Sequence, residues 1–300
     1  MTWPGLGVVV VLYGTSAADS PALRGLAEHV REDDGIHVAV QDNSETPSSD
    51  QDLPTVVEDY VARPDNPGLS EAYQRAAELF SSAGIEWMAL LDQDTTVTRE
   101  YLDEVLDIVR GRVTVPSSVA VLVPKLEDSG RQVSPHGRVR LRSRSVPTSR
   151  GVVSGFSTHL NSGSVLRLEA VRRIGGLPEG YPLDYLDHAL ASRLRESGGL
   201  TWVLGATLRH RLSLLERRSL SAARLASILE AERRYHLEFG SRGDVAWLAA
   251  RLWAGAVLST THLRPSPDAA LERRAAVAAT LALLTRTRRL PERKVADAGL

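Results

Sequence analysis

The sequence of 300 residues contains no cysteine. Disulfides, thiolate metal sites and cysteine nucleophiles are therefore excluded, and the composition is compatible with a reducing compartment. No apolar stretch of 18 residues is free of charge, and the nearest candidate for a membrane span, 245–258, contains Arg251. The chain does not start with a basic region followed by an apolar run, so we predict no signal peptide and expect a cytoplasmic protein.

Aromatic residues make up only 5% of the chain and do not interleave with its arginines, which gives nucleic-acid binding little support. Hydrophobic residues reach 43%, which is enough for a sizeable core. The net charge of −1 hides an asymmetry, because residues 1–204 carry a balance of −9 and residues 205–300 a balance of +8. A basic C-terminal region on an acidic body indicates an anionic partner, or a tail that folds back onto the body.

Strand-like and helix-like segments alternate through the first half of the chain. This order predicts a mostly parallel sheet with helices on both faces. β-Branched and apolar runs predict strands at 7–13, 36–41, 55–62, 86–91 and 119–125, and apolar periodicity with capping residues predicts helices at 21–31, 69–81 and 99–110.

The second half is less regular. Alternating arginines over 138–145 predict an exposed strand or hairpin, and 200–204 is strand-like. We expect helices at 167–174, 187–197, 219–239, 245–261 and 268–287.

Two carboxylates, Asp92 and Asp94, directly follow the apolar run 88–91. Ligands of parallel α/β sheets bind beyond the carboxyl ends of the strands. Two carboxylates one residue apart suit a hard divalent cation that holds a diphosphate. The alternative interpretation is a helix N-cap with acidic first-turn residues, a role that Thr95 and Thr96 would also serve.

Two further segments could contact a nucleotide. Asp42 begins an Asp-Asn-Ser sequence at the end of the second strand, where a carboxylate and an amide can read the imide edge and ribose of a pyrimidine nucleoside. The alternative there is a turn that closes the strand. The loop 65–70, with Asn66 and Gly68, could present N–H groups to a nucleotide, or could be only a turn and helix cap.

The remaining candidates lie after residue 160. Asp187 is expected to open a helix, where a carboxylate is either a cap or, facing a pocket, a general base within reach of a substrate hydroxyl. His210 follows the strand-like 200–204 and could bind a divalent metal or be structural. Small or polar residues that could line the same pocket are Asn161, Ser162, Gly163 and Asp184.

The order of these segments over residues 6–215 resembles the family 2 inverting glycosyltransferases of the glycosyltransferase-A fold. Within them it looks most like the bacterial rhamnosyltransferase and galactofuranosyltransferase branch. The ordered motifs are D-N-S, N-P-G-L-S-x-A, L-L-D-Q-D-T, N-S-G, G-G-L, a carboxylate before L-x-x-R-L-x-x-x-G, and a histidine.

The resemblance implies an α/β catalytic domain over 1–215, with a nucleotide-sugar half of about 1–125 and an acceptor half of about 126–215. The C-terminal helical region would cover 216–300. The roles implied at matching positions are nucleobase binding by Asp42, nucleotide binding by Asn66, Gly68 and Asp92, metal binding by Asp92, Asp94 and His210, the catalytic base at Asp187, and a donor and acceptor pocket at Asn161, Ser162, Gly163 and Asp184.

The implied activity is inverting transfer of a rhamnose-like or galactofuranose-like sugar from a dTDP- or UDP-linked donor, with Mn²⁺ or Mg²⁺. The acceptor would be a glycan or a lipid-linked molecule of cell-surface polysaccharide synthesis. Departures from the family pattern leave the donor open: Gly14 replaces a common asparagine, Gln74 replaces another, and Ala189 stands where an acidic residue is usual.

The residues themselves also allow other functions. A non-catalytic nucleotide-sugar-binding scaffold of a polysaccharide assembly complex is one, although the intact acidic motifs argue against it. A sugar nucleotidylyltransferase would need a basic residue in the loop 14–17, which has none. The C-terminal helices carry Trp247 and Trp253 among many arginines and could lie on the inner leaflet of the membrane. The alternative for these helices is a cap on the catalytic domain or a homodimer interface.

Overall fold

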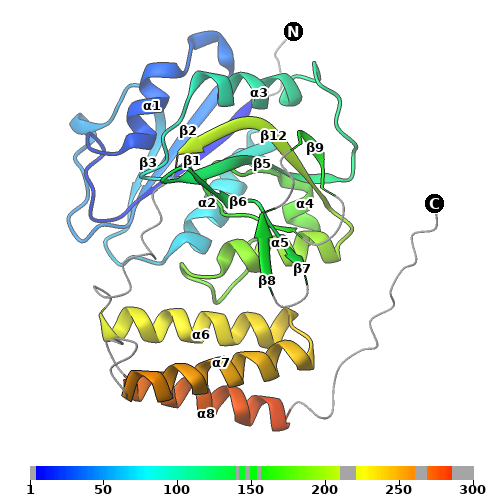
Figure 1. The fold of residues 1–300 in the computed structure, drawn as a ribbon. Coiled ribbons are helices and arrows are strands. Elements are labelled where there is room, and N and C mark those ends of the chain that lie inside the picture. Colours follow the sequence, from blue (N-terminus) through cyan, green and yellow to red (C-terminus); the bar gives the residue numbers. More distant parts are fainter. Residues whose placement is uncertain are drawn as a thin grey trace. The chain divides into compact units, whose positions relative to one another are not determined.

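A computed structural model describes residues 5–139, 142–145, 149–153, 157–209, 221–260 and 269–285. The chain divides into two compact units, residues 1–213 and residues 214–300. Figure 1 shows an α/β unit built around a sheet and a second unit made of helices.

The first unit contains a nine-stranded sheet in the order β3-β2-β1-β4-β11-β5-β12-β9, with β6 paired to β5. Pairing is parallel between β1 and both β2 and β4, between β2 and β3, and between β5 and β12. The mostly parallel sheet is therefore confirmed. The strands are β1 (Leu6–Leu12), β2 (Ile36–Asp42), β3 (Val57–Ala62), β4 (Trp87–Asp92), β5 (Val119–Asp128), β6 (Arg131–Ser134), β9 (Gly151–Val152), β11 (Val165–Arg167) and β12 (Leu200–Arg209).

The short strand β11 runs antiparallel between β4 and β5, which the sequence did not predict. It joins the half of the sheet that holds β1 to the half that holds β12. It pairs with β4 on one side and with β5 on the other, so its buried backbone groups have hydrogen-bond partners on both sides. Because β11 is antiparallel to both strands, the residues before it lie at the carboxyl ends of β4 and β5, and the residues after it lie at their amino ends.

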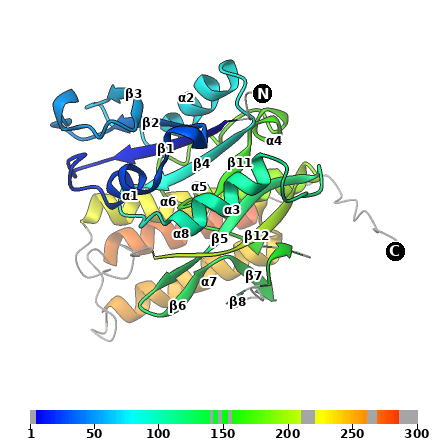
Figure 2. The ribbon, with the colours of Figure 1, turned by 90° about the horizontal axis from the view of Figure 1, so that it is seen from above.

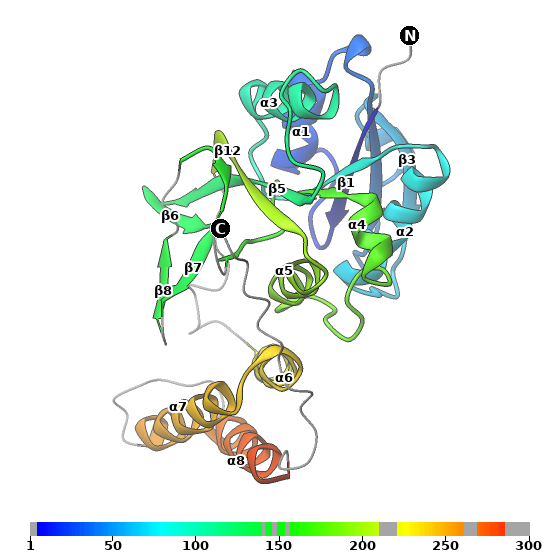
Figure 3. The same cartoon turned by 90° about the vertical axis from the view of Figure 1, so that its right-hand side faces the viewer.

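Helices cover both faces of this sheet (Figures 2 and 3). Leu6, Val8, Val10 and Leu12 of β1 pack with α1 and α3 in one core. On the other face, a Cβ on Gly7 would lie 2.4 Å from the ring of Phe80 in α2, so only glycine permits this approach. The helices of this unit are α1 (Pro21–His29), α2 (Leu69–Ser82), α3 (Arg99–Val109), α4 (Leu168–Arg173) and α5 (Leu186–Glu196), with 3₁₀ turns at Glu32–Asp34 and Asp50–Asp52.

A second, three-stranded sheet lies beside the main one, in the order β10-β7-β8. Its strands are β7 (His136–Val139), β8 (Arg142–Ser145) and β10 (Ser157–Thr158). Strands β7 and β8 pair antiparallel, with Arg138 opposite Ser143. The hairpin predicted over 138–145 is confirmed, although it begins two residues earlier.

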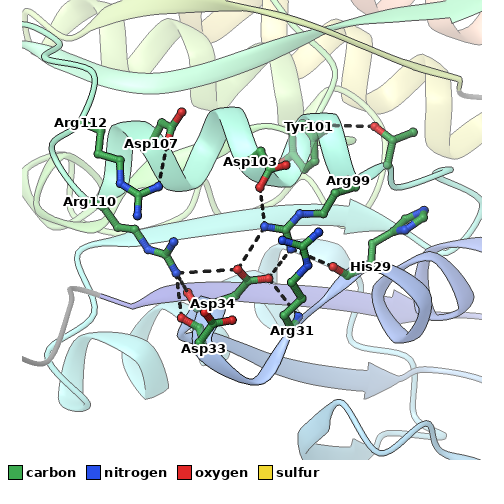
Figure 4. A network of polar contacts seen from close by, with 11 residues as sticks. His29, Arg31, Asp33, Asp34, Arg99, Tyr101, Asp103, Asp107, Arg110 and Arg112 are labelled. Carbon is green, nitrogen blue, oxygen red and sulfur yellow. Dashed lines mark hydrogen bonds and ion pairs between the residues drawn. The ribbon is translucent and has the colours of Figure 1, made fainter.

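A buried ion-pair network fixes the amino end of β2 (Figure 4). Asp34, in the turn before β2, has a side chain only 4% exposed. It accepts hydrogen bonds from the Arg99 guanidinium at 2.5 Å and from the Arg31 amide at 3.0 Å, and Arg110 lies at 3.8 Å. Burial raises the pKa of Asp34, but the bonds from Arg99 and Arg31 and both positive charges outweigh burial and lower it overall.

The second unit consists of α6 (Ala222–Phe239), α7 (Arg242–Thr260) and α8 (Ala269–Thr285). Helices α7 and α8 pack through a small core of Leu248, Ala249, Leu252, Ala276 and Ala279. The three predicted helices are confirmed within the described residues. None of the helices described is long and apolar enough to cross a membrane.

Candidate functional site

Two of the predicted acidic residues lie at the same edge of the sheet, at the carboxyl end of β1. Asp42 is opposite Leu12 in the β1–β2 register, and Asp92 is opposite Val11 in the β1–β4 register. The two carboxylates therefore come from the strands on either side of β1. This edge is where ligands bind in parallel α/β sheets.

The carboxylate of Asp92 is held by two hydroxyl groups from distant parts of the chain. Tyr73 of α2 donates to Oδ1 at 3.4 Å, and Ser162 donates to Oδ2. Tyr73 and Ser162 are both fully buried, whereas Asp92 is partly exposed. The bonds fix the orientation of the carboxylate while its surface stays open to a ligand.

The charge of Asp187 also acts on the Tyr73 hydroxyl. Burial is the largest cause that raises the pKa of Tyr73 far above its ordinary value, and the negative charges of Asp92 and Asp187 add to it. Both carboxylates thus lie close enough to one buried hydroxyl to act on its ionisation. The structure brings together the predicted metal-motif residue and the predicted base, which are 95 residues apart in the sequence.

The residues after Asp92 do not form a helix cap. Helix α3 begins at Arg99, and its N-cap is Thr98, whose side chain accepts from the Tyr101 amide. The alternative of an acidic first turn at 92–94 is therefore wrong. Asp94 is partly exposed in the loop between β4 and α3, so an oxygen ligand at this position remains accessible.

Gln93 ties this loop to the loop after β1. Its side chain accepts from the Tyr13 amide at 2.7 Å and donates to the Tyr13 carbonyl at 3.2 Å and to Thr15 at 3.0 Å. The Tyr13 side chain is left 56% exposed at the carboxyl end of β1. The role of Gln93 could not be predicted from the sequence, because its partners are about 80 residues away and leave no local signal.

Asp42 closes a turn, as its alternative interpretation predicted. Oδ1 accepts from the Ser44 amide at 3.0 Å and Oδ2 from the Ser48 amide at 2.8 Å, and Tyr60 donates to Oδ2 at 3.3 Å. Burial raises the pKa of Asp42, but the bonds from Ser44 and Ser48 prevail and lower it. The carboxylate is ionised and orients the 43–48 loop, and its role toward a nucleobase stays a proposal.

The segment 161–163 runs directly beside the end of β4. The Gly163 amide donates to Leu90 at 2.7 Å, and the Gly163 carbonyl accepts from Tyr101 at 2.8 Å. Asn161 is 7% exposed, and its Oδ1 has no hydrogen-bond partner among the described residues. Asn161 directly precedes Ser162, which contacts Asp92, and its buried acceptor without a described partner is a group that a bound ligand could satisfy.

Helix α2 is joined to the segment that leads to Asp187. The Leu69 amide donates to the Pro182 carbonyl at 2.6 Å, the Ser70 hydroxyl donates to the Pro178 carbonyl at 2.7 Å, and the Leu177 amide donates to Gln74 at 2.9 Å. Gln74, noted above as a departure from the family pattern, therefore has a structural partner here.

The two residues predicted to contact a nucleotide in the loop 65–70, Asn66 and Gly68, lie before α2. Asn66 is exposed, with a left-handed φ of 45°, and its amide closes a turn on Arg63. Gly68 is the N-cap of α2, with a φ of 93°, and contributes no side chain. These contacts describe the turn and cap of the alternative interpretation, and nucleotide binding by the loop stays a proposal.

Asp187 lies in the first turn of α5, where the helix dipole favours a negative charge. The N-cap is Tyr185 in the left-handed conformation, and it makes no side-chain cap. Asp187 is partly exposed and accepts from the His188 amide at 2.7 Å. Asp184, three residues earlier, is partly exposed in the same segment. Asp187 is therefore not the cap of this helix.

His210 lies outside the described residues, so its predicted place in a metal site has no structural counterpart here. The residue before it, Arg209, is paired with Thr96, two positions after Asp94. Within the described ranges, no three histidine or acidic side chains cluster as a metal site would require. The partly exposed carboxylates of Asp92 and Asp94 offer the oxygen ligands that Mg²⁺ and Mn²⁺ prefer, so this edge fits a hard cation.

No protein-family model and no curated protein matches the chain. The chain does match solved structures. Residues 1–349 of S. aureus TarS match with a TM-score of 0.51 and 13% identity, covering 92% of this chain and 91% of that one. The same TarS fragment in complex with UDP-GlcNAc matches with a TM-score of 0.50 and 14% identity, covering 95% and 74%.

A longer TarS chain matches with a TM-score of 0.50 and 16% identity. The match covers 78% of this chain but only 39% of that one, so this chain spans well under half of that relative. At these identities the likeness establishes the fold alone. Together with the sheet order and the antiparallel β11, it identifies the glycosyltransferase-A fold with C-terminal helices.

Proposed function

We propose that this protein is a metal-dependent inverting glycosyltransferase. Its donor would be a dTDP- or UDP-linked hexose, rhamnose-like or galactofuranose-like, and its acceptor a glycan or lipid-linked molecule of cell-surface polysaccharide synthesis. The observation that carries the proposal is the position of Asp92 at the ligand-binding edge of the sheet, where the Tyr73 hydroxyl holds it and the charge of Asp187 also raises the pKa of Tyr73. The UDP-GlcNAc complex of TarS is consistent with a nucleotide-sugar donor.

In this proposal the first half of the unit holds the donor. Asp42 orients the 43–48 loop toward a nucleobase, and the loop with Asn66 and Gly68 faces the nucleotide. The Asn161 carboxamide oxygen, which is buried and without a described partner, accepts a donor-sugar hydroxyl in the pocket formed with Ser162, Gly163 and Asp184. The pocket groups fix the sugar between the two carboxylates.

Asp94, with Asp92 and His210, would hold the divalent cation. A bound cation of this kind neutralises charge on a diphosphate leaving group. Asp92 is fixed by Tyr73 and Ser162, so its contribution depends on these two hydroxyls. Asp92 would therefore contact the cation that holds the diphosphate without any rearrangement of its carboxylate.

Asp187 would be the general base. It takes the proton of the acceptor hydroxyl as the oxygen attacks the anomeric carbon, and the bond from that carbon to the diphosphate breaks on the opposite side. The configuration inverts in one displacement, and no covalent enzyme intermediate is needed. General-base help of this kind accelerates such steps by about 10²–10⁴-fold.

The test is an Asp187→Asn variant. We expect it to bind UDP or dTDP as the unmodified protein does and to lose at least about 10²-fold in transfer, because only the proton acceptor is removed. Transfer is followed as nucleoside diphosphate released from a panel of donors with a cell-envelope extract as acceptor. Glu179→Gln, an exposed carboxylate in the same segment, is the matched control.

Normal turnover by Asp187→Asn would refute the assignment of the base. Nucleotide binding without transfer by the unmodified protein would favour the non-catalytic scaffold instead.

A further inference from the structure

Helix α8 exposes a stripe of apolar side chains. Val277, Leu281 and Leu284 are 44%, 56% and 64% exposed. Their spacing of four and three residues places them on one side of the helix. The opposite side is used in packing, since Ala276 and Ala279 are fully buried against α7. The stripe is therefore not part of the core of the helical unit.

Helix α7 extends this surface. Trp253 and Val257 are one turn apart and are 42% and 58% exposed. The Trp253 indole donates to the Thr280 hydroxyl of α8 at 3.2 Å, so the ring lies at the junction of the two helices. We call Trp253, Val257, Val277, Leu281 and Leu284 together the α7–α8 apolar face.

Basic residues outnumber acidic ones in and after these two helices. The acidic residues of α7 and α8 are Asp244, which accepts from Ser241 in the first turn of α7, and Glu272, which is only 8% exposed. Arg273 and Arg274 are exposed at the start of the α8 stripe. The sequence that follows α8, residues 286–294, adds five basic residues and one acidic residue.

We propose that the α7–α8 apolar face binds an anionic phospholipid bilayer and lies in its interface. Apolar side chains with a tryptophan would enter the boundary between headgroups and acyl chains, while the arginines contact the phosphates. The helices described are not long and apolar enough to cross a membrane, which agrees with a surface position.

A second copy of the chain fits this face less well than a bilayer does. In a two-fold dimer the same patch faces itself. The arginines at its border would then approach each other, and the face exposes no carboxylate within the described ranges to pair with them. An anionic lipid surface supplies the missing negative charge.

This inference goes beyond the proposed function and does not depend on it, because no donor-site residue takes part. The experiment uses the full chain with vesicles of phosphatidylglycerol and phosphatidylcholine, and with vesicles of phosphatidylcholine alone. Co-sedimentation gives the partition coefficient. Tryptophan fluorescence of the unmodified protein and of Trp253→Phe separates the signal of Trp253 from that of the other four tryptophans. Light scattering gives the oligomeric state without lipid.

We expect binding to the anionic vesicles with a blue shift of the fluorescence, and a loss in high salt. The double variant Leu281→Gln/Leu284→Gln should lower the partition coefficient by about tenfold or more. The double variant Arg273→Gln/Arg274→Gln should weaken binding to anionic vesicles alone. Leu200→Gln, an exposed leucine of the first unit, is the matched control and should bind normally.

Circular dichroism confirms that each variant keeps its helices. Absence of binding by the unmodified protein would overturn the proposal. So would equal binding to both vesicle types, or binding that the leucine variant leaves unchanged. A dimer that the leucine variant dissociates would assign the face to a second copy instead.

Discussion

The substitution Asp34→Asn tests the energetics of the network in Figure 4. The Asp34 side chain is 4% exposed and lies between Arg99 and Arg110, whose side chains are 20% and 10% exposed. The variant keeps the size of the side chain but removes its charge, so two largely buried guanidinium groups lose their shared anion. Loss of one partner of a buried pair costs about 3–5 kcal/mol.

Arg99 keeps two other partners, the Asp103 carboxylate and the His29 carbonyl. We therefore expect a loss at or just below the bottom of that range, about 2–3 kcal/mol of unfolding free energy. For a unit of about this size, such a loss lowers the melting temperature by about 5–10 °C. The matched control is Asp103→Asn, which removes a carboxylate from the same arginine at a position that is 54% exposed.

An exposed pair of this kind contributes about 0–1 kcal/mol, so the control should melt within about 3 °C of the unmodified protein. Calorimetry of the first unfolding transition measures both variants. Equal losses in the two variants would refute the argument that burial decides the difference. Nucleotide binding should be unchanged in both, because the network lies at the amino end of β2 and the candidate site at its carboxyl end.

The Asp34 carboxylate also makes the stability of the folded state depend on pH, with a direction that its lowered pKa determines. The pKa of Asp34 is lowered from its ordinary value of 3.8, because the bonds from Arg99 and Arg31 exceed the opposing effect of burial. A lowered carboxyl pKa stabilises the folded state above the pKa of the unfolded chain. That stability is lost as the pH falls through the folded pKa. The difference between the unmodified protein and Asp34→Asn should therefore be constant near pH 7 and shrink below about pH 4.

Two further substitutions test the construction of the site. Tyr73→Phe removes the hydroxyl that orients Asp92. We expect calorimetry to show about tenfold weaker binding of nucleotide with Mn²⁺, with little change in melting temperature. An unchanged affinity would show that Tyr73 is not part of the site. In Gly68→Ala, a residue with a φ of 93° would gain a Cβ only 2.6 Å from the Pro182 carbonyl oxygen. We expect this variant to lose about 1–3 kcal/mol more unfolding free energy than the control Gly84→Ala, whose Cβ would meet nothing within 4 Å. Equal thermal shifts in the two glycine variants would show that the approach to Pro182 costs nothing.

Most of the sheet could be predicted from the sequence because its strands carry local signals. All seven residues of β1 are buried, as a continuous β-branched run indicates. The start of α1 was equally readable, since Ser20 accepts from the Leu23 amide and Pro21 begins the helix. Strand β11 has only three residues and is held by pairing on both sides, so nothing in its own sequence distinguished it.

The site was only partly predictable for a similar reason. The acidic motif at 92–94 follows a readable strand, so its position at the sheet edge could be deduced. Tyr73 is one of the buried residues of α2, and its helical spacing in the sequence indicates only a core residue, so the contact of its hydroxyl with Asp92 leaves no signal. The bond between Gln74 and Leu177 joins residues 103 positions apart. Such contacts are set by tertiary packing and have no local pattern.

We propose that the edge formed by β1, β2 and β4 binds a metal–nucleoside diphosphate. Titration calorimetry of UDP and dTDP, with Mn²⁺ and then with EDTA, tests it most directly on the unmodified protein, Asp94→Ala and the exposed control Glu100→Ala. We expect binding that requires both the metal and Asp94 and that is normal in the control. Binding that persists in EDTA and in Asp94→Ala, or no binding of either nucleotide, would contradict it.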